Sequence, residues 1–259
     1  MKLYTDAQLV QVIAQRRSVR SFTAEVMNDA DFDTLKAIVA DIDPAGARLS
    51  LARSGEIGRG ASYGVISGRP AYVVLHGDDV LAAAVAAEYF VLAATIAGFG
   101  TCWLAGTFKP AMFGSAVMRQ GARIPAVIAV GRPAGRLTMI DRVFRLAVGS
   151  SRRKSADKLF FEGTIASPVA VTDGGEAIDP ILEALRLAPS SSNSQAWRVI
   201  KASTGKYLLY MLSDNHYTAL DAGIAVCHLS LAAGRQPSFD AAAAAMASAP
   251  ARWHFVAAI

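Results

Sequence analysis

Residues Ala71–Gly100 read AYVVLHGDDVLAAAVAAEYFVLAATIAGFG and join a short apolar run to the most apolar stretch of the chain. The run Ala71–His76 lies between Pro70 and Gly77, which is typical of a short β-strand. Leu81–Gly100 has about the length needed to cross a bilayer, but Glu88 lies in its middle and no cluster of Lys or Arg flanks it. We therefore expect a strand followed by a helix that is buried in a protein core.

N-terminal to this stretch, apolar residues at helical spacing predict two amphipathic helices, over Thr5–Gln15 and Asp31–Ile42. The pattern then breaks into Gly, Ser, Arg and Ala over Asp43–Gly68, which indicates a long loop of the kind that often covers a site. A further strand is expected at Ala126–Val130, where Gly131–Pro133 closes it.

The second half of the chain repeats this order at a nearly constant offset, which predicts two α+β units of the same plan. The expected units are residues 1–165 and a shorter unit of residues 176–259, joined by a linker around Gly163–Gly175 that is rich in Gly, Pro and Ser. Alternation of helix and strand occurs in any α/β chain and remains the alternative explanation. The matching segments are a helix at Ile178–Leu187, a strand at Tyr207–Leu212, an apolar helix at Tyr217–Ala233, and the terminal RWHFVAAI, which resembles RIPAVIAV at Arg123–Val130.

Composition narrows the classes of function. Apolar residues make up 53% of the chain, which favours extensive internal burial. Cys102 and Cys227 are isolated in apolar runs, and the four His do not cluster, so neither a disulfide framework nor a metal site is expected. The net charge is +5, but the basic residues do not form one run, so nucleic acid is not an expected partner. Without a signal-peptide pattern or a membrane span, a cytoplasmic location is expected.

Two polar segments could carry chemistry. Gln15–Phe22, QRRSVRSF, crowds three Arg and one Ser into five positions, a set that can hold a phosphate and place a guanidinium against a polar ring. Ala188–Ile200, APSSSNSQAWRVI, offers hydroxyl and amide groups able to read the edge of a heterocycle. The alternatives are a basic helix end favoured by the helix dipole and a polar turn with a helix cap.

Together with Gly98–Gly106, GFGTCWLAG, these segments resemble the motifs of the nitroreductase superfamily. Its members carry RRSxR on the first helix, a P-S-S-x-N-x-Q-P-W loop, and G-x-G-T-C-W-L-x-G after a long buried helix. This chain has RRSVR at Arg16–Arg20 and PSSSNSQAW at Pro189–Trp197, with Ala196 where Pro is usual. The late position of the second motif resembles the branch in which a duplicated chain mimics the usual homodimer, and the resemblance covers nearly all 259 residues.

This resemblance implies an α+β, nitroreductase-like fold of two pseudo-symmetric repeats, with FMN as cofactor. Basic and polar residues of the first motif would contact the FMN phosphate and ring, and the loop of the second repeat would contact the same flavin. A basic cluster that includes Lys154 would close the phosphate site, and backbone groups after the third motif would face flavin N5. The implied cofactor-binding residues are Arg16, Arg17, Ser18, Arg20, Leu104, Ala105, Gly106, Thr107, Arg152, Arg153, Pro189, Ser190, Ser191 and Asn193.

The implied reaction is hydride transfer from NAD(P)H through the flavin to a small electron-poor acceptor, such as a nitroaromatic or a quinone. FMN would carry the chemistry, so no catalytic side chain is expected. A non-catalytic FMN carrier or sensor on the same fold is the alternative. One FMN per chain is expected, in a monomer that is a pseudo-dimer or in a weak homo-oligomer. Acceptor choice is expected to lie in Asp43–Gly68 and Phe108–Gly121, the two least patterned stretches.

Overall fold

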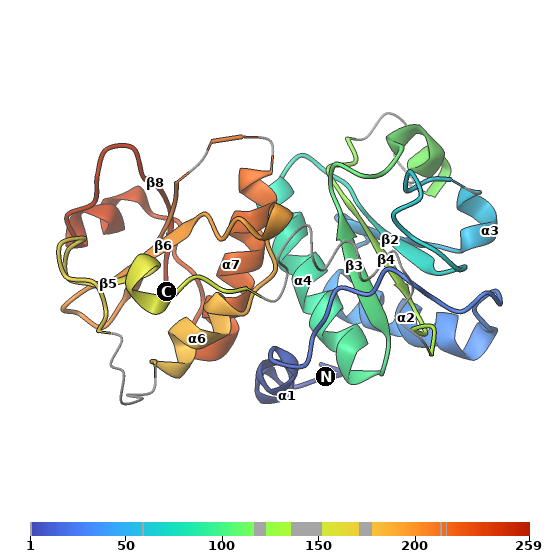
Figure 1. Cartoon of the computed structure of the whole chain (residues 1–259), viewed down its shortest axis with the longest axis horizontal. Coiled ribbons are helices and arrows are strands. Elements are labelled where there is room, and N and C mark those ends of the chain that lie inside the picture. The colour runs from blue at the N-terminus through green and yellow to red at the C-terminus, as the bar shows by residue number, and fades with distance from the viewer. Residues whose placement is uncertain are drawn as a thin grey trace. The chain divides into compact units, whose positions relative to one another are not determined.

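The computed structural model describes residues 2–58, 60–116, 123–135, 152–170, 178–212, 214–215 and 217–259. The chain divides into two compact units, Met1–Gly149 and Ser150–Ile259 (Figure 1). Each unit combines helices with a four-stranded sheet, so the α+β class expected from the sequence is confirmed.

The sheet of the first unit has the strand order β1-β2-β4-β3, and all neighbouring strands are antiparallel. The long helix α4 contacts β1, β2 and β3 and is itself contacted by α1 and α2 (Figure 1). The elements are α1 (Asp6–Val12), α2 (Asp29–Ile42), β1 (Leu49–Ala52), α3 (Ser54–Ile57), β2 (Ala71–Leu75), α4 (Val80–Ile96), β3 (Gly100–Leu104), the 3-10 helix η1 (Pro110–Ala116) and β4 (Val127–Gly131).

Burial on both faces explains the continuous apolar strands of this sheet. One face packs into a cluster closed by α3, η1 and the chain around Ala61 and Val65. On β3, Trp103 donates a hydrogen bond of 2.8 Å from its indole Nε1 to Glu88 of α4. The small side chains of α4 allow burial on most of its surface, including the fully buried Glu88. Among the described residues, no helix has the length and apolarity to span a bilayer.

Two expectations for the first unit were wrong in detail. The stretch Asp43–Gly68 is not one loop, because it contains β1 and α3. The Asp43 carboxylate accepts hydrogen bonds from the amides of Arg48 and Leu49, at 2.7 and 2.9 Å, and this turn directs β1 along β2. A four-residue strand at a sheet edge is specified mainly by this pairing. The first helix is also shorter than expected, because α1 ends at Val12.

The sheet of the second unit has the order β5-β6-β7-β8, in which β5 is parallel to β6 and the other pairs are antiparallel. Helices α6 and α7 contact each other, and α7 contacts β7. The elements are η2 (Ala156–Lys158), β5 (Phe160–Glu162), α6 (Pro180–Arg186), η3 (Ser191–Asn193), β6 (Trp197–Lys201), β7 (Tyr207–Met211), α7 (Thr218–Ala233), η4 (Ala241–Met246) and β8 (His254–Ala258).

The two units follow the same plan. In the first unit the order is α2, β1, β2, α4 and β4, and β2 pairs with both β1 and β4. In the second it is α6, β6, β7, α7 and β8, and β7 pairs with both β6 and β8. Strands β3 and β5 are additions at the sheet edges. The repeated order of helices and antiparallel strands matches the internal repeat read from the sequence.

The division between the units falls earlier than the boundary expected from composition. Strand β5 pairs with β6 over Phe160↔Val199 to Glu162↔Lys201, which joins this segment to the second sheet. The turn after β5 folds back on it, since Glu162 N donates to Ser167 O at 2.8 Å. Most of the expected linker at Gly163–Gly175 is therefore part of the second unit as far as Ala170, and residues 171–177 lie outside the described residues.

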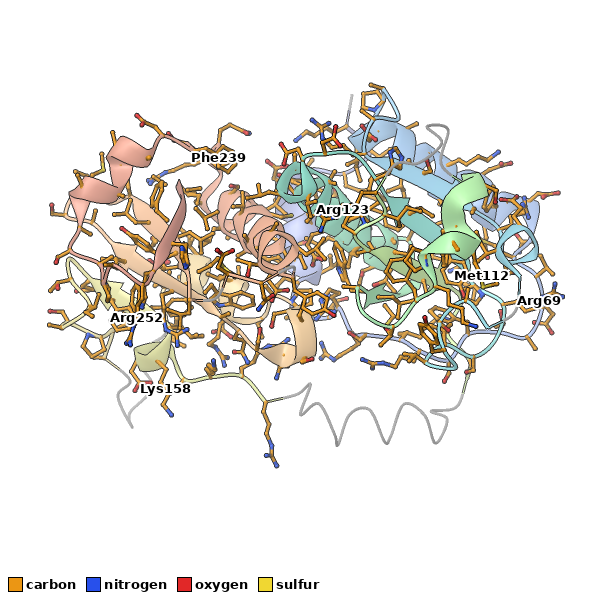
Figure 2. The ribbon with its side chains drawn as sticks, turned by 90° about the horizontal axis from the view of Figure 1, so that it is seen from above. Arg69, Met112, Arg123, Lys158, Phe239 and Arg252 are labelled. Atoms are coloured by element: carbon orange, nitrogen blue, oxygen red, sulfur yellow. The ribbon has the colours of Figure 1, made fainter. Side chains whose placement is uncertain are left out.

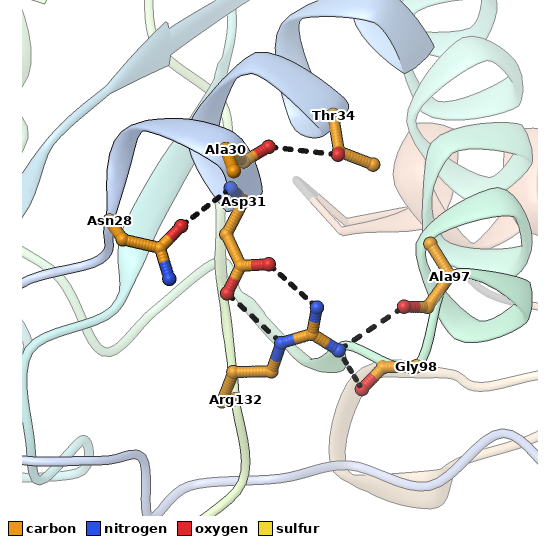
Figure 3. A network of polar contacts seen from close by, with 7 residues as sticks. All are labelled: Asn28, Ala30, Asp31, Thr34, Ala97, Gly98 and Arg132. Carbon is orange, nitrogen blue, oxygen red and sulfur yellow. Dashed lines mark hydrogen bonds and ion pairs between the residues drawn. The ribbon is translucent and has the colours of Figure 1, made fainter.

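The side chain of Arg132 joins three elements of the first unit (Figure 3). Arg132 directly follows β4, and its Nε and Nη2 donate to the two carboxylate oxygens of Asp31 on α2, at 3.0 and 2.6 Å. Its Nη1 donates to the carbonyls of Ala97 and Gly98 after α4, at 3.3 Å each. The hydrogen bond from Arg132 lowers the pKa of Asp31. The planar guanidinium thus connects the start of α2 with the end of α4.

We expect Arg132→Lys to lower the free energy of unfolding by about 1 kcal/mol, because an ammonium cannot form two parallel hydrogen bonds and part of the pair is solvent-screened. Urea unfolding followed by circular dichroism measures the change. Arg48→Lys is the matched control, since Arg48 makes a single 3.7 Å contact with Asp43. An equal loss in both variants would contradict the assigned role.

His76 is a buried polar group directly after β2. Its Nε2 lies 2.9 Å from the hydroxyl oxygen of Ser50, and only 7% of the residue is exposed. Burial lowers the pKa of His76, against the opposing effects of Asp43 and of a hydrogen bond with the Leu49 backbone. The neutral imidazole is therefore the form that fits the folded unit.

A lowered pKa means that the unfolded chain binds more protons than the folded chain once the pH falls below the ordinary histidine value of about 6.5. We expect the free energy of unfolding to decrease between about pH 7 and pH 5 and to decrease less in His76→Gln. Urea unfolding at three pH values tests this. The same pH slope in both proteins would show that His76 does not titrate with unfolding.

Candidate functional site

The segment Arg16–Phe22 continues from α1 as an extended chain beside β3. Ser18 and Thr101 form a parallel bridge, in which the Val19 amide donates to the Thr101 carbonyl at 2.8 Å. Gly100 permits this approach, because a Cβ there would lie 2.7 Å from the nearest side-chain carbon of Val19. The fold therefore brings together two of the three predicted motifs, RRSVR and GTCWL.

Arg16 is buried at this junction. Its exposed fraction is 7%, and its Nε has no hydrogen-bond partner within the described part of the chain. Burial lowers the pKa of Arg16, and the negative charge of Glu88 opposes this shift. A desolvated guanidinium with an unused donor can form strong charge-assisted hydrogen bonds with an anion or a polar ring. Arg17 is exposed, whereas Ser18 and Arg20 are half-buried.

The backbone predicted to face flavin N5 follows β3 directly. The Leu104 side chain is buried, Ala105 and Thr107 are half-buried, and Gly106 is exposed. The chain is then held by a 2.8 Å hydrogen bond from Lys109 N to Ala61 O. Thus Leu104–Thr107 continues the strand that is bridged to Ser18.

In the second unit, a buried carboxylate organises the loop Pro189–Gln195. Asp221 of α7 accepts hydrogen bonds from the amide and the hydroxyl of Ser191, at 2.9 and 3.1 Å, and from the hydroxyl of Ser194 at 3.4 Å. Burial raises the pKa of Asp221, and these hydrogen bonds oppose the shift. Ser190 Oγ accepts from the amide of Gln195 at 2.9 Å. The loop is therefore held from within the unit.

These contacts stabilise an unusual backbone. Ser192, Asn193 and Gln195 have φ values of 50°, 56° and 45°, in the left-handed region that non-glycine residues rarely adopt. Each such residue costs on the order of 1 kcal/mol, so the surrounding contacts must determine the conformation. Backbone strain of this kind is concentrated at functional sites in proteins.

The basic segment Arg152–Lys154 is bound to this same loop. Asn193 donates from Nδ2 to the Arg152 carbonyl at 2.7 Å and accepts from Arg153 Nη1 at 2.6 Å. Arg153 also donates to the carbonyl of Leu187 at 3.1 Å, and Lys154 Nζ donates to the Ser194 carbonyl at 2.7 Å. Two motifs that the sequence assigned to different halves are thus joined within the second unit.

The three residues of this basic segment differ in the exposure and the hydrogen bonds of their side chains. The Arg152 side chain is exposed and makes no hydrogen bond or ion pair with the described residues, whereas Arg153 and Lys154 bind the loop. The pKa of Lys154 is lowered by burial and by the positive charges of Arg198 and Lys158, the latter lying on η2 (Figure 2). Arg152 is consequently the member whose guanidinium can bind a ligand without breaking contacts in the unit.

Sequence reasoning missed Asp221 as an organiser of the loop, and it used Glu88 only as evidence against a membrane span. The available signal was an acidic residue inside an apolar helix, which requires a polar partner when buried. For Ser191 and Asn193, contact with a cofactor stays a prediction, and the structure shows the polar groups of both already bonded to Asp221 and to the basic segment.

The α+β units, with the RRSVR segment bridged to β3, define a protein of the nitroreductase fold. The family model described as "Putative TM nitroreductase" matches residues 8–233, and the chain belongs to this family. Members of a nitroreductase family are oxidoreductases. No match is found among curated proteins.

Two solved structures illustrate what the chain resembles. A protein described as a putative nitroreductase of Thermotoga maritima is 21% identical, with a TM-score of 0.54, and the alignment covers 92% of this chain and 90% of that chain. A Bacteroides fragilis nitroreductase with bound FMN is 19% identical over 50% of this chain and 91% of its own, with a TM-score of 0.40. The similarity to the first protein shows the shared fold.

The different contacts of Arg152 and Arg153 predict different effects of their removal. Arg153→Ala should lower the free energy of unfolding by about 1 to 3 kcal/mol, because it removes a charged hydrogen bond to Asn193 and leaves that acceptor unpaired. Arg152→Ala should change it by less than about 0.5 kcal/mol, as expected for an exposed side chain. Urea unfolding of both variants measures the difference. Equal losses would show that the exposed guanidinium also stabilises the unit.

Proposed function

We propose that this protein is an FMN-dependent oxidoreductase that transfers hydride from NAD(P)H to a small electron-poor acceptor, such as a nitroaromatic or a quinone. The observation that carries the proposal is the buried Arg16 guanidinium, whose Nε lacks a hydrogen-bond partner among the described residues, beside the bridged β3. When bound, FMN supplies the redox chemistry. Its phosphate and its polar ring are groups that such a guanidinium recognises.

In the first unit, the proposed FMN-binding residues are Arg16, Arg17, Ser18 and Arg20, together with the backbone of Leu104–Thr107. Arg16 is held with little solvent around it, which strengthens each charged hydrogen bond that it forms. The negative charge of Glu88 opposes the lowering of the Arg16 pKa by burial. We propose that Arg20 stabilises negative charge on the reduced flavin.

In the second unit, we propose a narrower set of contacts than the sequence suggested. Arg152 has an exposed guanidinium that would bind the FMN phosphate. The Ser190 hydroxyl oxygen accepts a hydrogen bond from Gln195 N, so its proton remains available for donation to the flavin. Ser191, Asn193 and Arg153 would act chiefly by holding this loop and the Arg152 backbone. Pro189, at the start of this loop, remains a proposed FMN contact.

The proposal includes one FMN per chain, an active monomer and a cytoplasmic location, where reduced nicotinamide is available. No proton transfer by a side chain is required, because the residues act by binding, orientation and charge. The nitroaromatic or quinone acceptor would bind against the flavin after the nicotinamide has left.

The first test is FMN affinity, measured by flavin fluorescence. Arg16→Met and Arg152→Ala should each weaken binding about tenfold or more, since a charged hydrogen bond contributes about 1.5 to 3 kcal/mol. Arg152 is exposed, so its variant tests the assignment without disturbing a core. Arg48→Met is the control, because this exposed arginine lies outside the motifs. Wild-type affinity in both site variants would refute the proposed phosphate contacts.

The second measurement is the redox cycle. Under anaerobic conditions NAD(P)H should bleach the flavin absorbance and a quinone or nitroaromatic should restore it, with parallel double-reciprocal lines in the steady state. Tight FMN binding without NAD(P)H oxidation above that of free FMN would instead identify a carrier or sensor.

A further inference from the structure

Tyr63 is an exposed aromatic residue in a strained backbone conformation. Its exposed fraction is 64% and its φ is 49°, between Gly60 and Gly64, which both have φ values of 80°. An exposed ring gains little from burial, and a left-handed backbone is unfavourable for a tyrosine. Neither feature stabilises the unit, so a role in binding accounts for them better than a role in folding.

The loop that carries Tyr63 is nevertheless held at both ends. Ala61 and Val65 are buried in the core of the first unit, and Ala61 O accepts from Lys109 N at 2.8 Å. At the far end, Ser67 N donates to Arg20 O at 2.9 Å, and Phe22 N donates to Ser67 O at 3.0 Å. The loop is thus fastened to the segments that continue from Arg20 and from Thr107, both of which belong to the proposed flavin site.

Lys109 pairs with the Tyr63 ring. Its Nζ lies 5.3 Å from the ring centroid, and the residue is exposed directly before η1, on which Met112 is labelled in Figure 2. No carboxylate of the described residues forms an ion pair with Lys109. By contrast, Lys36 lies 5.6 Å from the Phe32 ring and is paired with Asp33 at 2.7 Å. The Tyr63–Lys109 pair therefore combines an accessible ring with an uncompensated positive charge.

We infer that Tyr63 and Lys109 form the acceptor subsite of this protein and select planar aromatic carboxylates over neutral aromatic compounds. The inference rests on the proposed function and adds the class of acceptor. The ring of such an acceptor would stack on Tyr63, and its carboxylate would pair with the Lys109 ammonium. Tyr63 and Lys109 come from the two stretches that the sequence assigned to acceptor choice.

For a nitrobenzoate, the reaction at this subsite would leave the carboxylate unchanged. The nitro group accepts one hydride equivalent from NAD(P)H and one hydrogen ion from the buffered solvent. It becomes a nitroso group, while one nitro oxygen leaves as water and NAD(P)⁺ is formed. The charge that Lys109 recognises is therefore present in both the substrate and the product.

The binding test uses benzoate and benzamide, two non-reducible compounds of similar shape that differ in charge. Calorimetric titration of the FMN-supplemented full chain should show a two- to fivefold preference for benzoate at low salt, as roughly expected of one exposed ion pair. The preference should shrink at about 0.5 M salt because of screening. Lys109→Met should abolish it and leave benzamide binding unchanged.

The ring is tested separately. Asparagine tolerates a positive φ, so Tyr63→Asn should keep the backbone conformation. Loss of stacking should lower the affinity for both benzoate and benzamide by roughly two- to tenfold. Tyr63→Phe should bind both as the wild type does. Lys36→Met is the matched control, since it removes a lysine from another aromatic pair and should leave the benzoate preference intact.

In the steady state, Lys109→Met should raise KM for 4-nitrobenzoate but not for 4-nitrobenzamide, with kcat unchanged. The inference is overturned if the wild type shows no preference for benzoate, or if Lys109→Met retains it. Flavin bleaching by NAD(P)H in the same samples distinguishes failure of the subsite from failure of the proposed function. If the flavin is bleached but Lys109→Met keeps the wild-type preference for benzoate, only the subsite is rejected. If the protein does not bind FMN, both the proposed function and the inference are rejected.

Discussion

The hydrogen bond from the Val19 amide to the Thr101 carbonyl determines how the first unit presents its polar residues. It fixes the chain after α1 as an extra extended segment beside β3, and Gly100 leaves the space for it. Because this segment carries the arginines of RRSVR, the pairing decides that Arg16 is buried and that Arg17 is not. It also sets the position of Ser67 and hence of the loop that carries Tyr63.

Two groups at these positions are unfavourable for stability. Arg16 is desolvated and incompletely hydrogen-bonded within the described residues, with Glu88 as a partial electrostatic compensation. Tyr63 combines exposure with a left-handed backbone. Natural proteins break local rules of stability mainly where function requires it. The segments that carry these two residues are hydrogen-bonded to each other, since Ser67 N donates to Arg20 O, which agrees with a binding site built from Arg16–Phe22 and Ala61–Ser67.

The two units share a plan of helices and strands but use polar groups differently. In the first, a buried cation near the sheet edge has an unused donor, whereas in the second the polar loop is largely satisfied by Asp221 and by the segment Arg152–Lys154. In the second arrangement the loop is held by hydrogen bonds, and the guanidinium of Arg152 is exposed. Duplication of a fold therefore does not imply duplication of a site, because the chemistry depends on a few residues grafted on the common frame.

The class of fold and most of the long helices and strands follow from the amino-acid sequence alone. The buried helix α4, the strands β2 and β4, and the repeat of this order in the second half follow from periodicity and from runs of apolar residues, which depend on local chain geometry. The motifs RRSVR, GTCWL and PSSSNSQ pointed to the nitroreductase family, and the family assignment bears this out.

The remaining features depend on contacts between residues distant in sequence, which local patterns do not specify. The edge strand β1 exists through its pairing with β2, and β5 belongs to the second unit through its pairing with β6. The electrostatic interaction of Arg16 with Glu88 and the hydrogen bonds of Asp221 to the serine loop depend on which side chains are buried. Local sequence patterns do not specify which polar side chains are removed from solvent.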